Sequence, residues 1–191
     1  MKRLHSTILV VDDDANDLMF TEEAFKKIGV TSKIQTAMNG RDAIAYLLGE
    51  GKYADRSVFG YPDFVMTDLK MPGVNGFDLL EHIRQNPKSA TIPVVVFSGS
   101  LDNDDVRRAY LSGANSYHLK PSSPTELREL LKALHDYWMA CELPVINGSA
   151  KNSETGGHYK LGTRFLESTA PWFVKPIAQT EPGADRAIMP H

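Results

Sequence analysis

Four short runs of this 191-residue sequence, each with the pattern of a buried strand, end in side chains that can take part in chemistry. The first run ends in Asp12 and Asp13, and the others end in Asp68, Ser98 and Lys120. Three carboxylates that meet at one place cannot all stay ionised unless a cation is near. Oxygen-only ligands select a hard cation, and Mg²⁺ with retained waters is the expected one.

A carboxylate beside a magnesium ion is suited to phosphoryl transfer. It can attack phosphorus and form an aspartyl-phosphate while the metal neutralises the phosphate oxygens. We assign the nucleophile to Asp68, because a loop rich in Pro, Gly and Asn follows it at 72–76 and leaves it at the tip of a strand. The Lys120 ammonium would hold a second phosphate oxygen, and the Ser98 hydroxyl would donate to a third.

Each of these side chains, taken alone, also has a purely structural interpretation. Asp12 and Asp13 can serve only as a turn and a helix cap, and an Asp such as Asp68 before a Pro/Gly loop commonly starts a turn. Ser98 is one hydroxyl among many, and Lys120 can be a solvated loop lysine. Their shared position at the ends of different predicted strands favours a common site.

The elements that must bring these residues together are five strands alternating with helices over residues 4–140. This alternation predicts an α/β domain with a doubly wound parallel sheet and right-handed crossovers. In such a sheet, ligands bind beyond the carboxyl ends of the strands. The strands are expected at 7–11, 33–37, 63–68, 93–97 and 115–119, and the helices at 16–28, 43–48, 77–86, 106–113 and 123–138.

Composition excludes several classes of function. A net charge of −3 predicts no nucleic-acid partner, and no apolar stretch approaches the roughly 20 residues that span a bilayer. The first residues do not have the pattern of a signal peptide. The single Cys141 fits a reducing cytoplasm. Residues 141–191 are predicted to form an irregular extension that docks on the domain or on a partner.

These motifs resemble the receiver domain of two-component response regulators. The resemblance covers residues 4–140 and implies a flavodoxin-like sheet of five strands in the order 2-1-3-4-5. The motifs that carry it are Val11-Asp12-Asp13, Asp68-Leu69-Lys70-Met71-Pro72 with Gly76, Ser98-Gly99, and Tyr117-His118-Leu119-Lys120-Pro121.

The resemblance also implies a role for each residue. Asp68 would be the phospho-acceptor, Asp13 would bind Mg²⁺ directly, and Asp12 would assist through water. The backbone carbonyl of Lys70 would complete the protein ligands. The remaining roles are a switch hydroxyl at Ser98, a switch aromatic at Tyr117, a phosphate-binding lysine at Lys120 and a cis peptide bond before Pro121. Such a protein catalyses only its own phosphorylation and dephosphorylation.

Partners follow from the same resemblance. A histidine kinase would deliver the phosphoryl group, and a downstream protein would bind the switched surface. The long connection at 49–62 and the last helix, ending in Asp136-Tyr137-Trp138, resemble stand-alone regulators, including those paired with bacterial phytochromes. The same helix is a candidate for pairing with a second copy of the chain.

Two other classes of function stay open at this stage. The first is a phosphohydrolase with an aspartyl-phosphate intermediate. Such enzymes place a general acid two residues after the nucleophile, and Lys70 at that position argues against this class. The second is a phosphorylation-independent adaptor, which has no physical need for the acidic, serine and lysine set.

Overall fold

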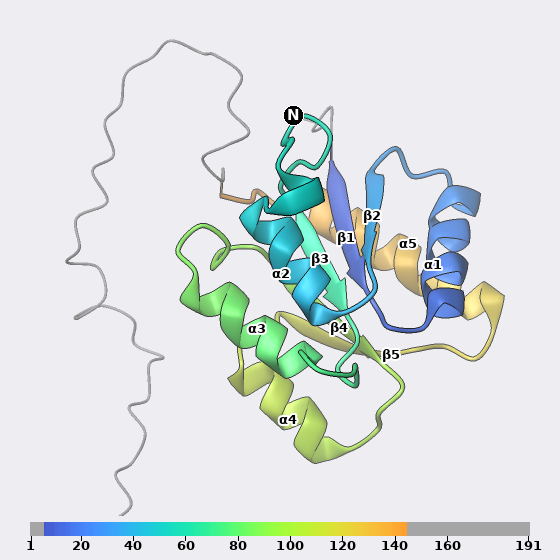
Figure 1. Cartoon of the computed structure of the whole chain (residues 1–191). Helices are drawn as coiled ribbons and strands as arrows, with labels where there is room; N and C mark the ends of the chain where they lie inside the picture. Colours follow the sequence, from blue (N-terminus) through green and yellow to red (C-terminus); the bar gives the residue numbers. More distant parts are fainter. Residues whose placement is uncertain (1–5, 145–191) are drawn as a thin grey trace, which may run out of the picture. The chain divides into compact units, whose positions relative to one another are not determined.

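The computed structural model describes residues 6–144, and in this range the chain forms a parallel five-stranded sheet of order β2-β1-β3-β4-β5 (Figure 1). The expected fold class and strand order are confirmed. The strands are β1 (Thr7–Val11), β2 (Lys33–Ala37), β3 (Phe64–Thr67), β4 (Val94–Ser98) and β5 (Ser116–Leu119).

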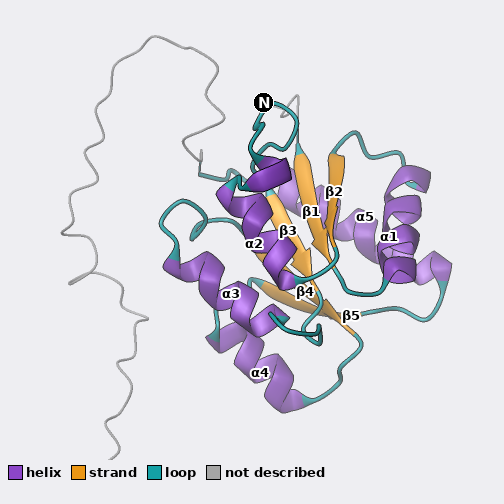
Figure 2. Cartoon of the chain, in the orientation of Figure 1, coloured by secondary structure: helices purple, strands orange, loops and turns teal. Residues whose placement is uncertain are grey.

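Helices cover both faces of this sheet, α1 and α5 on one side and α2, α3 and α4 on the other (Figure 2). Successive residues of β1 therefore enter different cores: Leu9 and Val11 pack towards α2 and α3, and Ile8 and Val10 towards α1 and α5. Burial on both faces explains why the central strands are almost wholly apolar. The helices are α1 (Ala15–Lys27), α2 (Gly40–Leu48), the 3₁₀ turn η1 (Gly51–Tyr53), α3 (Gly76–Gln85), α4 (Asn103–Leu111) and α5 (Pro124–Ala140).

Caps fix where the helices beside the strand tips begin. The Asp14 side chain accepts a hydrogen bond from the backbone N–H of Asn16 at the start of α1. At the start of α3, Asn75 and Asp78 form a reciprocal capping box. These caps fix the points at which the loops after β1 and β3 end and the helices begin.

The long connection between α2 and β3 is a packed element rather than an open loop. The guanidinium of Arg56 donates hydrogen bonds to the backbone carbonyls of Tyr46, Leu47 and Phe59. The rings of Tyr46, Tyr53 and Phe59 pack edge to face on one another. This segment is thus held by its own aromatic cluster, which the spacing of its residues does not reveal.

Some expectations were wrong in detail or lie outside the described residues. Strand β3 stops at Thr67, one residue before Asp68, and the peptide bond before Pro121 is trans, as are all peptide bonds in the described range. An X–Pro peptide bond has a small intrinsic preference for the trans form, and trans is the form found here. Among the described residues no helix has the length and apolar character needed to cross a bilayer. The predicted extension lies outside the description from residue 145 onward.

Candidate functional site

Three carboxylates gather where β1 and β3 end. Asp12, Asp13 and Asp68 each offer one oxygen, and these oxygens lie within 4.8 Å of one another. Asp12 is held by its backbone N–H, which donates to the Ala37 carbonyl, and its side chain accepts from the Asp14 N–H at 3.1 Å. The Asp13 side chain is exposed. Such a set of hard oxygen donors, one of them open to solvent, fits Mg²⁺.

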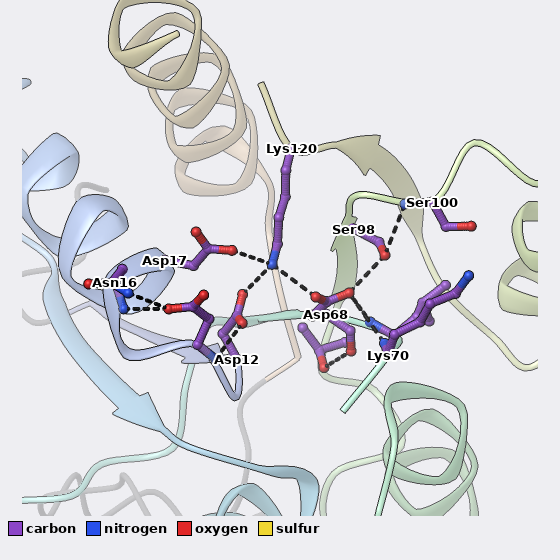
Figure 3. A network of polar contacts seen from close by, with 11 residues as sticks. Asp12, Asn16, Asp17, Asp68, Lys70, Ser98, Ser100 and Lys120 are labelled. Carbon is purple, nitrogen blue, oxygen red and sulfur yellow. Dashed lines mark hydrogen bonds and ion pairs between the residues drawn. The ribbon is translucent and has the colours of Figure 1, made fainter. Parts of the chain in front are cut away.

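The Lys120 ammonium offsets part of the negative charge of this cluster (Figure 3). Its Nζ lies 2.7 Å from Asp12, 2.7 Å from Asp17 and 2.9 Å from Asp68. The Lys120 backbone N–H donates to the Ser98 carbonyl at 2.9 Å, which ties the end of β5 to the end of β4. Lys120 therefore uses its three ammonium protons on three carboxylates.

Asp17 was missed by the sequence reasoning. It lies in the first turn of α1, where an acidic residue is common because its negative charge interacts favourably with the positive end of the helix dipole. The sequence offered one indication: Asp17 follows Asp12 by five residues, so that Asp12 lies just before α1 and Asp17 lies in its first turn. Only the packing of α1 against the sheet shows that its carboxylate reaches Lys120.

Burial and hydrogen bonding act on these groups in opposite directions. Burial raises the pKa of Asp12 above its ordinary value despite the bond from Lys120. Burial would also raise the pKa of Asp68, but the hydrogen bonds from Lys120 and Ser98 outweigh it and the net shift is downward. Burial would lower the pKa of Lys120, and the bonds to its carboxylate partners raise it instead. The lowered pKa favours the ionised form of Asp68, the form that can act as a nucleophile.

Asp68 is held by different partners at its two oxygens. Oδ1 accepts hydrogen bonds from the Ser98 hydroxyl at 2.7 Å, the Leu69 N–H at 2.5 Å and the Lys70 N–H at 3.3 Å. Oδ2 faces Lys120. The backbone N–H of Asp68 donates to the Val11 carbonyl at 2.9 Å, which continues the β1–β3 ladder one step past the strand.

Gly76 makes this turn possible. Its backbone N–H donates to the Leu69 carbonyl at 3.0 Å, so α3 begins directly against the Asp68 loop. A Cβ atom at position 76 would lie 2.2 Å from the Asp68 carbonyl oxygen, a distance that no real Cβ adopts. The glycine in the motif thus allows a close approach of two backbone segments.

Ser98 and Tyr117 belong to one hydrogen-bonded path. The Ser98 side chain is buried and reaches Asp68, and its Oγ also accepts from the Ser100 N–H at 3.4 Å. The Tyr117 hydroxyl donates to the Ser100 carbonyl at 2.8 Å, and its ring packs against the buried cluster under α2 and α3. The structure therefore places Tyr117 beside the loop after β4.

Lys70 turns its side chain away from the carboxylate cluster. Its ammonium pairs with Asp105 of α4 at 3.1 Å, and the same oxygen of Asp105 accepts from the Ser100 hydroxyl at 2.6 Å. Nothing in the sequence pattern singled out Asp105, because it lies among other acids at the start of α4. That the Lys70 carbonyl binds a metal stays a prediction.

The chain is similar to known proteins over this described part. The family model of the response regulator receiver domain matches residues 8–132. The probable methanogenesis regulatory protein FilR2 of Methanothrix harundinacea is 37% identical over 133 residues, which are 69% of this chain and 83% of that protein. Response regulator Rcp1 of Synechocystis is 29% identical over 132 residues, 69% of this chain and 88% of that protein.

The chain is also similar to solved structures of response regulators. The phosphorylated cyanobacterial phytochrome response regulator RcpA is 32% identical, with a TM-score of 0.68, over 74% of this chain and 99% of that one. The bacteriophytochrome response regulator AtBRR is 30% identical, with a TM-score of 0.61, over 74% of this chain and 99% of that one.

Proposed function

This chain belongs to the response regulator receiver domain family, and on that premise we propose that Asp68 accepts a phosphoryl group from a histidine kinase with Mg²⁺ as the cofactor. The observation that carries the proposal is the position of Asp68. Its carboxylate lies between the two acids that end β1, the Lys120 ammonium and the Ser98 hydroxyl. The domain that does this is assigned to residues 4–140, and residues 141–191 to an extension.

In the proposed reaction an Asp68 oxygen attacks the phosphorus of a phosphohistidine. The new O–P bond forms as the P–N bond breaks, and the electron pair of that bond returns to the imidazole. Lys120 and Ser98 hold two of the phosphoryl oxygens as charge moves onto them. Asp12, Asp13, Asp68 and the Lys70 carbonyl would hold Mg²⁺, which when bound neutralises phosphoryl oxygens.

Phosphorylation would then act on the path through Ser98 and Tyr117. The phosphoryl group carries about −1.5 to −2 charges and three strong acceptors, in place of the single charge of the Asp68 carboxylate. The Ser98 hydroxyl already points at Asp68, so it needs only to exchange a carboxylate oxygen for a phosphoryl oxygen. This strengthens one arrangement of the β4–α4 loop and of Tyr117, and so biases the surface of α4, β5 and α5.

The partners and the location are proposed from the same evidence. RcpA and AtBRR are described as phytochrome response regulators, which supports a phytochrome-type kinase as donor. A single cysteine supports a reducing cytoplasm. Output is proposed to pass to a downstream protein and to a second copy of the chain through α5, where Tyr137 is exposed. The chain is proposed to catalyse only its own phosphorylation and dephosphorylation.

The experiment is phosphorylation of the full chain by acetyl phosphate or a histidine kinase in the presence of Mg²⁺, followed by intact mass spectrometry. We expect one phosphoryl group that hydroxylamine removes, as it does an acyl phosphate. Asp68→Asn should abolish it, and Asp136→Asn, which removes an exposed carboxylate of α5, should not. A phosphoryl group that is still added to Asp68→Asn would refute the assignment, and sustained turnover of a phosphate ester would favour the phosphohydrolase.

A further inference from the structure

The Lys70 ammonium has a partner other than the site. Its backbone N–H faces Asp68, yet its side chain extends away from that carboxylate (Figure 3) and pairs with Asp105 at 3.1 Å. Lys70 belongs to the loop that carries the acceptor, and Asp105 belongs to α4. The ion pair therefore ties the acceptor loop to the first turn of this helix.

Asp105 is the fixed member of this pair. Its side chain is 21% exposed, whereas that of Lys70 is 65% exposed. The Ser100 hydroxyl donates to the same Asp105 oxygen at 2.6 Å, and the Ser100 carbonyl accepts from Tyr117. Asp105 is thus held by a second donor and by its place in the helix, as well as by Lys70.

We propose that Asp105 is a positioning residue that competes with the phosphoryl group on Asp68 for the Lys70 ammonium. This inference rests on the proposed function. Phosphorylation replaces the single negative charge of the Asp68 carboxylate, two residues before Lys70, by about −1.5 to −2 charges on the phosphoryl oxygens. An exposed ion pair contributes little, so the ammonium can exchange one anion for the other at small cost. Because the competition is reciprocal, phosphorylation weakens the tie to α4, and the tie weakens the phosphorylated state.

The test is a double-mutant cycle on Asp105 and Lys70 in the full chain. The probe is beryllium fluoride with Mg²⁺, a phosphoryl analogue that adds to a carboxylate, and its affinity is measured by ¹⁹F NMR titration. Asp105→Asn should tighten binding about two- to fivefold, the range of one exposed ion pair. The same substitution in a Lys70→Gln background should have no effect, and raising the salt concentration should shrink the gain.

Controls separate this role from a structural one. Asp136→Asn makes the same charge change in another exposed pair, with Lys132, and should leave the affinity unchanged. Ser100→Ala removes the other donor to Asp105, and Asp105→Glu should restore the wild-type affinity. An Asp105→Asn effect that is equally large in the Lys70→Gln background would overturn the inference alone. Wild-type protein that binds no beryllium fluoride would instead overturn the proposed function, and this inference with it.

Discussion

Removal of the Lys120 ammonium is the sharpest test of how the site is held together. In Lys120→Met the acids Asp12 and Asp68, whose side chains are 6% and 12% exposed, lose their cation. Losing one partner of a fully buried pair costs about 3–5 kcal/mol. Lys120 is 18% exposed and Asp17 is 40% exposed, so water recovers part of the loss. We expect a loss of about 2–3 kcal/mol in the free energy of unfolding at pH 7 without Mg²⁺.

The loss should depend on pH with a definite sign. In the wild type the folded-state pKa of Asp68 lies below its ordinary value of 3.8, so its contribution is present above that pH and is lost as the pH falls through the folded-state pKa. Without Lys120 we expect burial to raise the pKa of Asp68 and to raise that of Asp12, which is already above its ordinary value, still further. Protonation then removes the unpaired buried charge from the variant. The difference in the free energy of unfolding between the two proteins should therefore shrink as the pH falls from 7 towards 4.

Urea unfolding at several pH values, with and without Mg²⁺, measures this difference. A divalent cation on the same carboxylates should also reduce it at pH 7, since it replaces the missing charge. Lys132→Met, which breaks the exposed pair with Asp136 on α5, serves as the control and should show only a small change that is independent of Mg²⁺. A loss in Lys120→Met that is the same at every pH and in Mg²⁺ would refute the electrostatic account.

Two further predictions concern the scaffold around the site. Arg84→Ala removes a half-buried guanidinium that donates to the backbone carbonyls of Ala90, Ile92 and Gly113 and to the side chain of Asn115. Urea unfolding should show a loss of about 3 kcal/mol in the free energy of unfolding. Arg84→Lys should not recover this loss, because an ammonium lacks the planar set of donors. Gly76→Ala should abolish phosphorylation of Asp68 and lower stability because its Cβ meets the Asp68 carbonyl. Gly99→Ala, with open space at the Cβ, should still be phosphorylated, and an equal loss in both glycine variants would contradict this reasoning.

The sequence predicted the strand tips well because their arrangement follows from topology. Once the strands are parallel, the ends of β1, β3, β4 and β5 must meet at one edge, so the residues that follow them converge whatever the details of packing. The convergence of Asp12, Asp68, Ser98 and Lys120 needed no knowledge of side-chain conformation. The order of the strands came instead from the resemblance of the motifs to a known family.

The contacts that were missed depend on how helices are rotated and how far side chains reach. Asp17 is the acid in the first turn of α1 and Asp105 is one of two acids in the first turn of α4, and each pairs with a lysine of the site region. Arg84 has the sequence context of an ordinary surface arginine on α3, yet burial lowers its pKa and its donors meet backbone carbonyls. The periodicity of the sequence predicts that such residues belong to a helix, but it does not predict which side chain or carbonyl each of them contacts.

The count of protons on Lys120 suggests why Asp17 is present at all. An ammonium has three donors, and here Asp12, Asp17 and Asp68 take all three. In the proposed phosphorylation the Asp68 carboxylate would become a neutral acyl group, and the negative charge would lie on the phosphoryl oxygens. The donor that faced Asp68 can then turn to a phosphoryl oxygen while Asp12 and Asp17 keep their bonds. Two constant partners would thus orient Lys120 before and after transfer, and the exchange would require no new cation and leave no buried acid without a partner.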